Sequence, residues 1–85
     1  MWQIEFTKRA DKDFSKLTPE IRKRIDKAIE EKLLINPDQH LIPLSGELSE
    51  FYKFRVGDYR LLCSKDGTKL VITLIKVAHR REVYH

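Results

Sequence analysis

Cations alternate with aromatic or apolar residues in residues 52–60, where the sequence reads YKFRVGDYR and Gly57-Asp58 interrupts the alternation. Alternate residues of an extended strand share a face, so we expect Lys53 and Arg55 to lie opposite to the aromatic and aliphatic side chains. A two-residue turn at residues 57–58 would place Arg55 directly across from Arg60. The spacing therefore predicts three cations together on one open face of a hairpin.

This crowding of like charges favours the binding of an anion. Like charges that oppose each other directly destabilise a strand pair, by about 0.2–1 kcal/mol, and no acidic residue belongs to the set. A cluster of one sign attracts a partner of the opposite sign, and a phosphate group is the expected partner here. The alternative is a basic surface whose side chains only extend into solvent.

A second segment, VAHRREVYH at residues 77–85, carries groups suited to phosphodiester cleavage. Such cleavage needs donors that neutralise a pentacoordinate phosphate, a base for the 2′-hydroxyl proton and an acid for the leaving 5′-oxygen. A tyrosine could stack on a nucleotide base. No metal-ligand cluster or other catalytic set competes with these groups, so the expected site is free of metal and cofactor. The candidates in this segment are His79, Arg80, Tyr84 and His85.

The net charge of +4 is unevenly distributed along the 85 residues. Residues 1–50 carry 9 Lys/Arg against 10 Asp/Glu, whereas residues 51–85 carry 8 against 3. The basic character therefore belongs to the C-terminal part, where it can create a local field.

Local patterns predict an N-terminal strand and a two-helix hairpin. Residues 2–6 alternate apolar and polar, as a half-buried strand does. Thr7 can cap a first helix, and Thr18 followed by Pro19 can begin a second. The second helix is expected to stop at Asn36.

The rest of the chain predicts an irregular connection and a three-stranded antiparallel meander. The connection covers residues 36–50, and the tail at residues 81–85 is expected to be extended. The turn at residues 57–58 has glycine first, as a type II′ turn requires, and Asp66-Gly67 is typical of a type I′ turn. We expect one α+β domain over residues 1–85, with both helices on one sheet face. The expected strands are residues 51–56, 59–64 and 70–77, the last being the central one.

Composition excludes several classes of protein. No apolar run has the roughly 20 residues of a membrane span, and MWQIEFTKRA at the N-terminus lacks the features of a signal peptide. The one cysteine, Cys63, forms no internal disulfide and is expected to fill the core. A soluble protein in the cytoplasm is therefore expected.

The two basic segments resemble the RelE/ParE superfamily of toxins from bacterial type II toxin–antitoxin systems. The similarity covers nearly the whole chain and rests on PLSGELSEFYKFRVGDYRLL and IKVAHRREVY. The messenger-RNA endonucleases of RelE type are the most similar members. The resemblance implies a RelE-like fold and an endoribonuclease, or mRNA interferase, that cleaves messages in the ribosomal A site and inhibits translation.

The resemblance also implies roles for individual residues. Lys53 matches a proposed general base. Arg55 and Arg60 match positions that bind and stabilise the phosphate. Arg80 matches an arginine that protonates or stabilises the leaving group, and Tyr84 matches a tyrosine that positions the nucleotide.

The end of the chain departs from some RelE proteins. The interval between Arg80 and Tyr84 is shorter, and the sequence ends at His85 without a C-terminal helix. His79 or His85 could therefore share the acid–base work.

Two other functions fit the same resemblance. ParE-type members share the fold and inhibit DNA gyrase without cutting RNA, and an inactive member could act only as an antitoxin partner and corepressor. A toxin implies a cognate antitoxin, acidic where it covers the basic face, and operator DNA would be reached only through that antitoxin.

Overall fold

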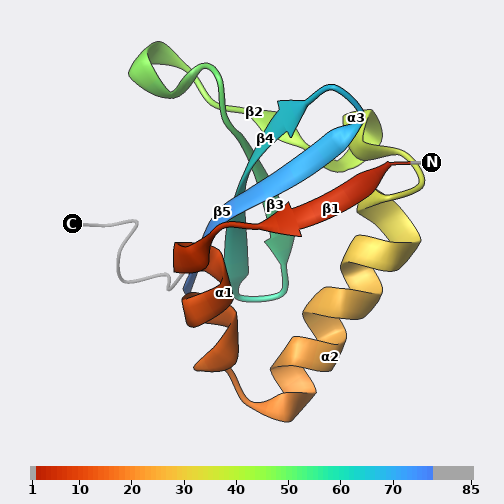
Figure 1. Ribbon diagram of the computed structural model, residues 1–85, viewed down its shortest axis with the longest axis vertical. Coiled ribbons are helices and arrows are strands. Elements are labelled where there is room, and N and C mark those ends of the chain that lie inside the picture. Colours follow the sequence, from red (N-terminus) through yellow and green to blue (C-terminus); the bar gives the residue numbers. More distant parts are fainter. Residues whose placement is uncertain (1, 78–85) are drawn as a thin grey trace.

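The computed structural model describes residues 2–77, which form a five-stranded sheet with helices against it (Figure 1). The sheet order is β1-β5-β4-β3-β2, with β1 parallel to β5 and the other neighbours antiparallel. The expected α+β class and the meander of β3, β4 and β5 are confirmed. The elements are β1 (Gln3–Phe6), α1 (Lys8–Ser15), α2 (Pro19–Ala28), a π-helical turn (Ile29–Leu33), α3 (Pro37–His40), β2 (Ile42–Pro43), a 3-10 turn (Gly46–Leu48), β3 (Tyr52–Val56), β4 (Tyr59–Asp66) and β5 (Lys69–Val77).

Threonine caps begin both long helices, as predicted. The Thr7 hydroxyl accepts a hydrogen bond from the Ala10 N–H at 3.1 Å, and the Thr18 hydroxyl accepts one from the Ile21 N–H at 3.3 Å. Each bond satisfies a backbone donor that has no partner within its helix. The helix boundaries near residues 7 and 18 follow directly from these side chains.

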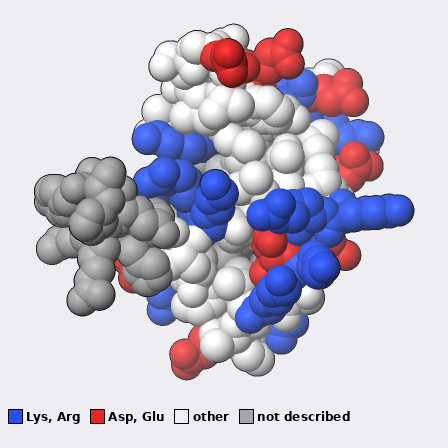
Figure 2. All heavy atoms as spheres, turned by 90° about the vertical axis from the view of Figure 1, so that its left-hand side faces the viewer, with Lys and Arg blue, Asp and Glu red and all other residues white. Residues whose placement is uncertain are grey.

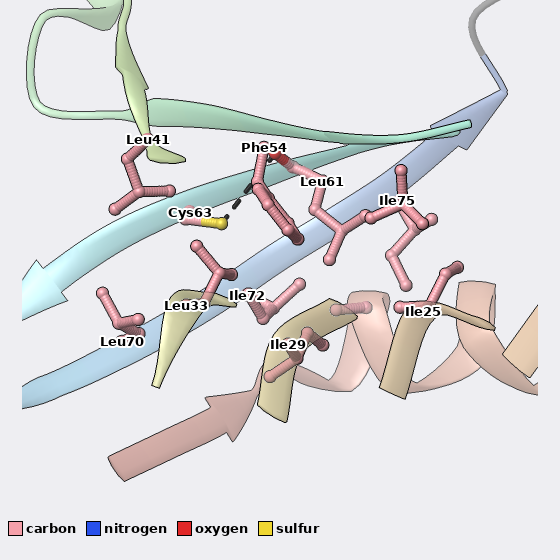
Figure 3. Close-up of a cluster of buried hydrophobic side chains, with 12 residues drawn as sticks. Ile25, Ile29, Leu33, Leu41, Phe54, Leu61, Cys63, Leu70, Ile72 and Ile75 are labelled. Atoms are coloured by element: carbon pink, nitrogen blue, oxygen red, sulfur yellow. Dashed lines mark hydrogen bonds between the residues drawn. The ribbon is translucent and has the colours of Figure 1, made fainter. Parts of the chain in front are cut away.

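The core lies between the helices and one face of the sheet (Figure 3). Ala10 of α1, Ile25 of α2 and Leu33 of the π-helical turn are fully buried there. Cys63 is also fully buried, so its expected place in the core is confirmed. The sheet contributes Phe54, Val56, Leu61, Cys63, Leu70, Ile72 and Ile75 to this cluster.

The connection at residues 36–50 is more regular than predicted. It contains α3, the short edge strand β2 and a 3-10 turn, so the expectation of an irregular segment was wrong. Strand β2 has two residues and pairs with β3, Ile42 with Lys53 and Pro43 with Tyr52. A pairing this short leaves no periodicity in the sequence from which it could be predicted.

Both hairpin turns begin with a glycine of positive φ. Gly57 (φ +56°) follows Val56 in the β3–β4 turn, as predicted for type II′. In the β4–β5 turn Asp66 pairs with Lys69, so Gly67 (φ +62°) and Thr68 are the turn residues. No other residue type in the described part of the chain has positive φ, whereas type I′ needs it at both central positions. The prediction of a type I′ turn at Asp66-Gly67 was therefore wrong.

The prediction that residues 70–77 form the central strand was wrong, because β4 occupies the middle of the sheet and β5 is the inner strand beside it. Strand β1 pairs with residues 69–72 of β5, so within residues 2–77 the second half of β5 has a strand neighbour, β4, on one side alone. The expected tail at residues 81–85 lies outside the described residues. Within residues 2–77, no helix has the length and apolar character that a membrane crossing requires.

Candidate functional site

Arg55 and Arg60 oppose each other across the β3–β4 hairpin, as predicted from the turn length. Both side chains are exposed on the sheet face opposite to the core, which we call the open face. The pair next to the turn is hydrogen-bonded in a two-residue hairpin, so Arg55 and Arg60 form the next, closely spaced pair, with Cα atoms about 4.5 Å apart. Lys53 is half-buried and shares this face, two residues from Arg55.

The structure adds Lys76 to this set, a residue that sequence reasoning missed. Lys76 pairs with Arg60 across β4 and β5, and it is exposed. Arg55, Arg60 and Lys76 thus form one row of cations across three adjacent strands, which we call the basic row.

Lys76 reaches the open face because β5 contains a β-bulge. Leu62 pairs with Leu74 and Cys63 pairs with Ile72, so Thr73 has no partner on β4. An extra residue reverses the faces of all residues that follow it. In the structure the bulge is seen as a spacing of three between the buried side chains of Ile72 and Ile75, but LVITLIKV is apolar on both faces and gives no sequence signal for it.

A groove lies beside the basic row, between the sheet and the loop that follows β2. Its volume is about 290 Å³. Leu44 and Leu48 come from that loop, where the Leu44 N–H donates to the Phe51 carbonyl at 3.0 Å. The floor is apolar and the charged lining is entirely basic. The lining residues are Leu44, Leu48, Lys53, Arg60, Leu62, Leu74 and Lys76.

Lys53, Arg55, Arg60 and Lys76 of the open face have no acidic partners among residues 2–77. The ion pairs in this part of the chain join Arg9 to Asp13, Lys65 to Asp38 and Lys69 to Glu5. Figure 2 shows Lys and Arg side chains across the middle of one side of the molecule, with uncharged residues between some of them and Asp or Glu atoms beside others. The arrangement therefore leaves positive charge available for an external anion.

Lys65 shows how a cation is neutralised elsewhere in the same sheet. Its ammonium group donates to an Asp38 carboxylate oxygen and lies 4.7 Å from the centre of the Tyr52 ring. The hydrogen bond to Asp38 raises the pKa of Lys65 above its ordinary value. Lys65 is thus occupied within the chain, in contrast to the cations of the basic row.

The thiol of Cys63 is unsuited to act as a nucleophile. It lies in the core, 3.9 Å from the Leu61 carbonyl oxygen that it contacts (Figure 3). Burial raises the pKa of the Cys63 thiol to about 12. Because the thiolate is the reactive form, the thiol is inert at neutral pH.

Four predicted site residues, His79, Arg80, Tyr84 and His85, lie outside the described residues. The described part of the site offers cations for phosphate groups and an apolar floor for a base or an aliphatic group. No His, Asp or Glu belongs to the groove lining within residues 2–77. In the same range, no group of three His, Cys, Asp or Glu side chains could hold a metal ion.

Comparison with known proteins places this chain in a family. A model of the ParE toxin of type II toxin–antitoxin systems, parDE, matches residues 4–84. Toxin RelG of Mycobacterium tuberculosis is 30% identical over 83 residues, covering 98% of this chain and 95% of that protein.

Solved structures show the same fold. A chain of the toxin–antitoxin complex RelBE2 from Mycobacterium tuberculosis has a TM-score of 0.83 at 31% identity and covers 89% of this chain and 96% of that chain. The isolated RelE toxin of E. coli has a TM-score of 0.78 at 26% identity and covers 99% of this chain and 92% of that chain. The fold is thus that of the small RelE toxins. The chain belongs to the RelE/ParE superfamily and is a toxin of a type II toxin–antitoxin system.

Proposed function

We propose that the toxin is an endoribonuclease that cleaves messenger RNA on the ribosome and thereby inhibits translation. The observation that carries this proposal is the basic row of Arg55, Arg60 and Lys76, which has no acidic partner among residues 2–77 and borders an apolar groove. Three cations in line suit a polyanionic backbone, and an apolar floor suits an unstacked base. Similarity to RelE toxins supports the choice of RNA.

In the proposed reaction, the 2′-oxygen of a ribose attacks the adjacent phosphorus. Lys53 accepts the 2′-hydroxyl proton, and the bond from phosphorus to the 5′-oxygen breaks. The departing 5′-oxygen takes a proton, so the products carry a 2′,3′-cyclic phosphate and a 5′-hydroxyl. Arg55 and Arg60 stabilise the charge that develops on the phosphate, an electrostatic effect worth about 100-fold or more in rate per donor.

The C-terminal segment completes the proposed site. Arg80 protonates or stabilises the leaving 5′-oxygen, and Tyr84 positions the nucleotide. His79 or His85 shares the acid–base work. These assignments follow the family resemblance and concern residues outside the described range.

The test of this function is cleavage of ribosome-bound message. Purified toxin is added to ribosomes programmed with a defined mRNA, and cuts are mapped by primer extension. We expect cuts in the message and a loss of about 100-fold or more in rate for the double variant Arg60→Ala, Arg80→Ala. The matched control Lys23→Ala removes an exposed cation from α2 and should cut like the wild type. Full activity of the double variant would refute the proposal.

We further propose a cognate antitoxin that covers the open face. The RelE chains of E. coli and Methanococcus jannaschii have been solved in complex with RelB antitoxins. An acidic segment would complement the basic row and speed association at low salt. In this proposal residues 1–85 act as one cytoplasmic domain, and operator DNA is contacted through the antitoxin alone.

A second candidate function is inhibition of DNA gyrase. The match to the ParE family model over residues 4–84 favours it. A supercoiling assay distinguishes the two functions, because a gyrase inhibitor blocks supercoiling and leaves ribosome-bound message intact. Inhibited gyrase together with uncut message would replace the first proposal by the second.

A further inference from the structure

The direction of Lys76 depends on a single extra residue in β5. Before the bulge, Leu70 and Ile72 face the core, and after it Ile75 does. Strict alternation from Ile72 would have placed Leu74 and Lys76 on the core side. The bulge at Thr73 therefore decides whether Lys76 lies on the open face.

Side chains from the N-terminal part of the chain hold this bulge. Strand β1 ends at Phe6, opposite Ile72, and the Thr7 N–H still donates to the Ile72 carbonyl at 2.9 Å. The Thr7 hydroxyl then donates to the Thr73 carbonyl at 2.7 Å. The Ile75 N–H donates to the Asp13 Oδ2 at 3.1 Å. Beyond the end of β1, the side chains of Thr7 and Asp13 therefore make the hydrogen bonds to the β5 backbone that a paired strand would otherwise make.

The Thr7 hydroxyl serves two elements at once. It accepts from the Ala10 N–H, which starts α1, and it donates its only proton to Thr73. The start of the helix and the bulge are therefore held at a fixed separation.

Asp13, in the second turn of α1, connects the same helix to β5 a second time. Its other carboxylate oxygen accepts from the Arg9 Nε at 3.3 Å, and its side chain is only 16% exposed. A backbone N–H that bonds a carboxylate is held more strongly than one that bonds a neutral acceptor. The bond to Ile75 fixes the residue directly before Lys76.

We propose that Thr7 and Asp13 are positioning residues, which hold the Thr73 bulge so that Lys76 extends the basic row. They act from the helical side of the sheet and touch no substrate. The effect on RNA cleavage rests on the proposed function, whereas the effect on the bulge does not.

Hydrogen exchange of the full chain tests the bulge directly, without any ligand. In the wild type, the Ile75 amide should be protected. In the variant Asp13→Ala, it should exchange about 10-fold faster or more, while the amides of Leu61 and Phe54 keep their rates. Asp11→Ala removes an exposed carboxylate from the same helix and is the matched control. An unprotected Ile75 amide in the wild type, or unchanged exchange in Asp13→Ala, would overturn the proposal.

Asp13→Asn covers the case in which Asp13→Ala does not fold. Its amide oxygen still accepts from the Ile75 N–H, so we expect the wild-type backbone shifts of residues 73–76 to be retained. Large shift changes at these residues in Asp13→Asn would contradict the assigned bond.

A double-variant cycle then tests the connection to Lys76. We expect Asp13→Ala to slow message cleavage about 10-fold in the wild type but less than about twofold in the Lys76→Ala background. In the Lys23→Ala background the full effect should remain, because Lys23 lies on α2 and has no role in the proposed reaction. Equal effects in both backgrounds would show a general loss of stability and refute positioning. If the wild type cuts no message while Asp13→Ala still frees the Ile75 amide, the proposed function fails and the positioning role stands.

Discussion

Arg55 and Arg60 face each other directly across the β3–β4 hairpin, on the side of the sheet that the helices leave open. The β4–β5 register places Lys76 on the other side of Arg60. Each guanidinium or ammonium group repels its neighbour, and no ion pair among residues 2–77 relieves this. This repulsion lowers the stability of the free protein, and the binding of an anion relieves it.

Replacing Arg60 by alanine should make the free toxin more stable. The change removes two like-charge contacts, so we expect a gain of about 0.5–1 kcal/mol in the free energy of unfolding, measured by urea denaturation at low salt. The same variant should lose RNA cleavage. Added salt should reduce the gain because it screens the repulsion. If Arg60→Ala were less stable than the wild type at low salt, repulsion within the basic row would not destabilise the free protein.

Replacing Lys76 by alanine should weaken binding of single-stranded RNA in a salt-dependent way. We expect the slope of log affinity against log salt to fall by about 0.7, as for the loss of one phosphate contact. Fluorescence anisotropy of a short labelled RNA gives this slope. Lys69→Ala is the matched control, because Lys69 lies on the same strand but pairs with Glu5 at 3.5 Å. Equal slopes for the Lys76 and Lys69 variants would show that Lys76 contacts no phosphate of the RNA.

Short-range chemistry explains which parts of the fold could be predicted. Thr7 and Thr18 cap helices through bonds to residues three positions on, and Gly57 defines a two-residue turn. Pairing between distant segments could not be predicted in this way. Strand β1 lies beside β5 with Gln3 opposite Lys69, and nothing in the QIEF pattern specifies that partner.

The same distinction applies to the site. Arg55 and Arg60 could be paired from sequence because the turn between them dictates the register. Lys76 could not be placed, since LVITLIKV is apolar on both faces and conceals the change of face at Thr73. The hydrogen bonds from Thr7 and Asp13 that hold this bulge depend on the packing of α1 against β5.

Replacing Gly57 by valine should disturb the pairing of Arg55 with Arg60. A β-branched residue at φ +56° is strained, so we expect a loss of about 1–2 kcal/mol in stability. Gly57→Asn is the matched control, because asparagine tolerates positive φ and should lose less. Thermal unfolding compares the two variants, and equal loss of stability in both would argue against backbone strain as the cause.

The buried thiol of Cys63 should make the protein less stable at alkaline pH. Burial raises its pKa from 9.0 to about 12, so between these values the unfolded chain releases a proton that the folded chain keeps. The contribution of the protonated Cys63 thiol to the free energy of unfolding is fully present below pH 9. It is lost as the pH rises towards 12, with a slope of up to about 1.4 kcal/mol per pH unit.

Urea denaturation of the wild type and Cys63→Ala over this pH range isolates the effect of the thiol, because lysine and tyrosine side chains titrate in both proteins. The variant loses some packing and should be less stable at pH 8. The difference in stability should then narrow as the pH rises, since only the wild type carries a thiol that ionises on unfolding. A difference that stays constant up to pH 11 would mean that the Cys63 thiol ionises as readily in the folded protein as in the unfolded chain.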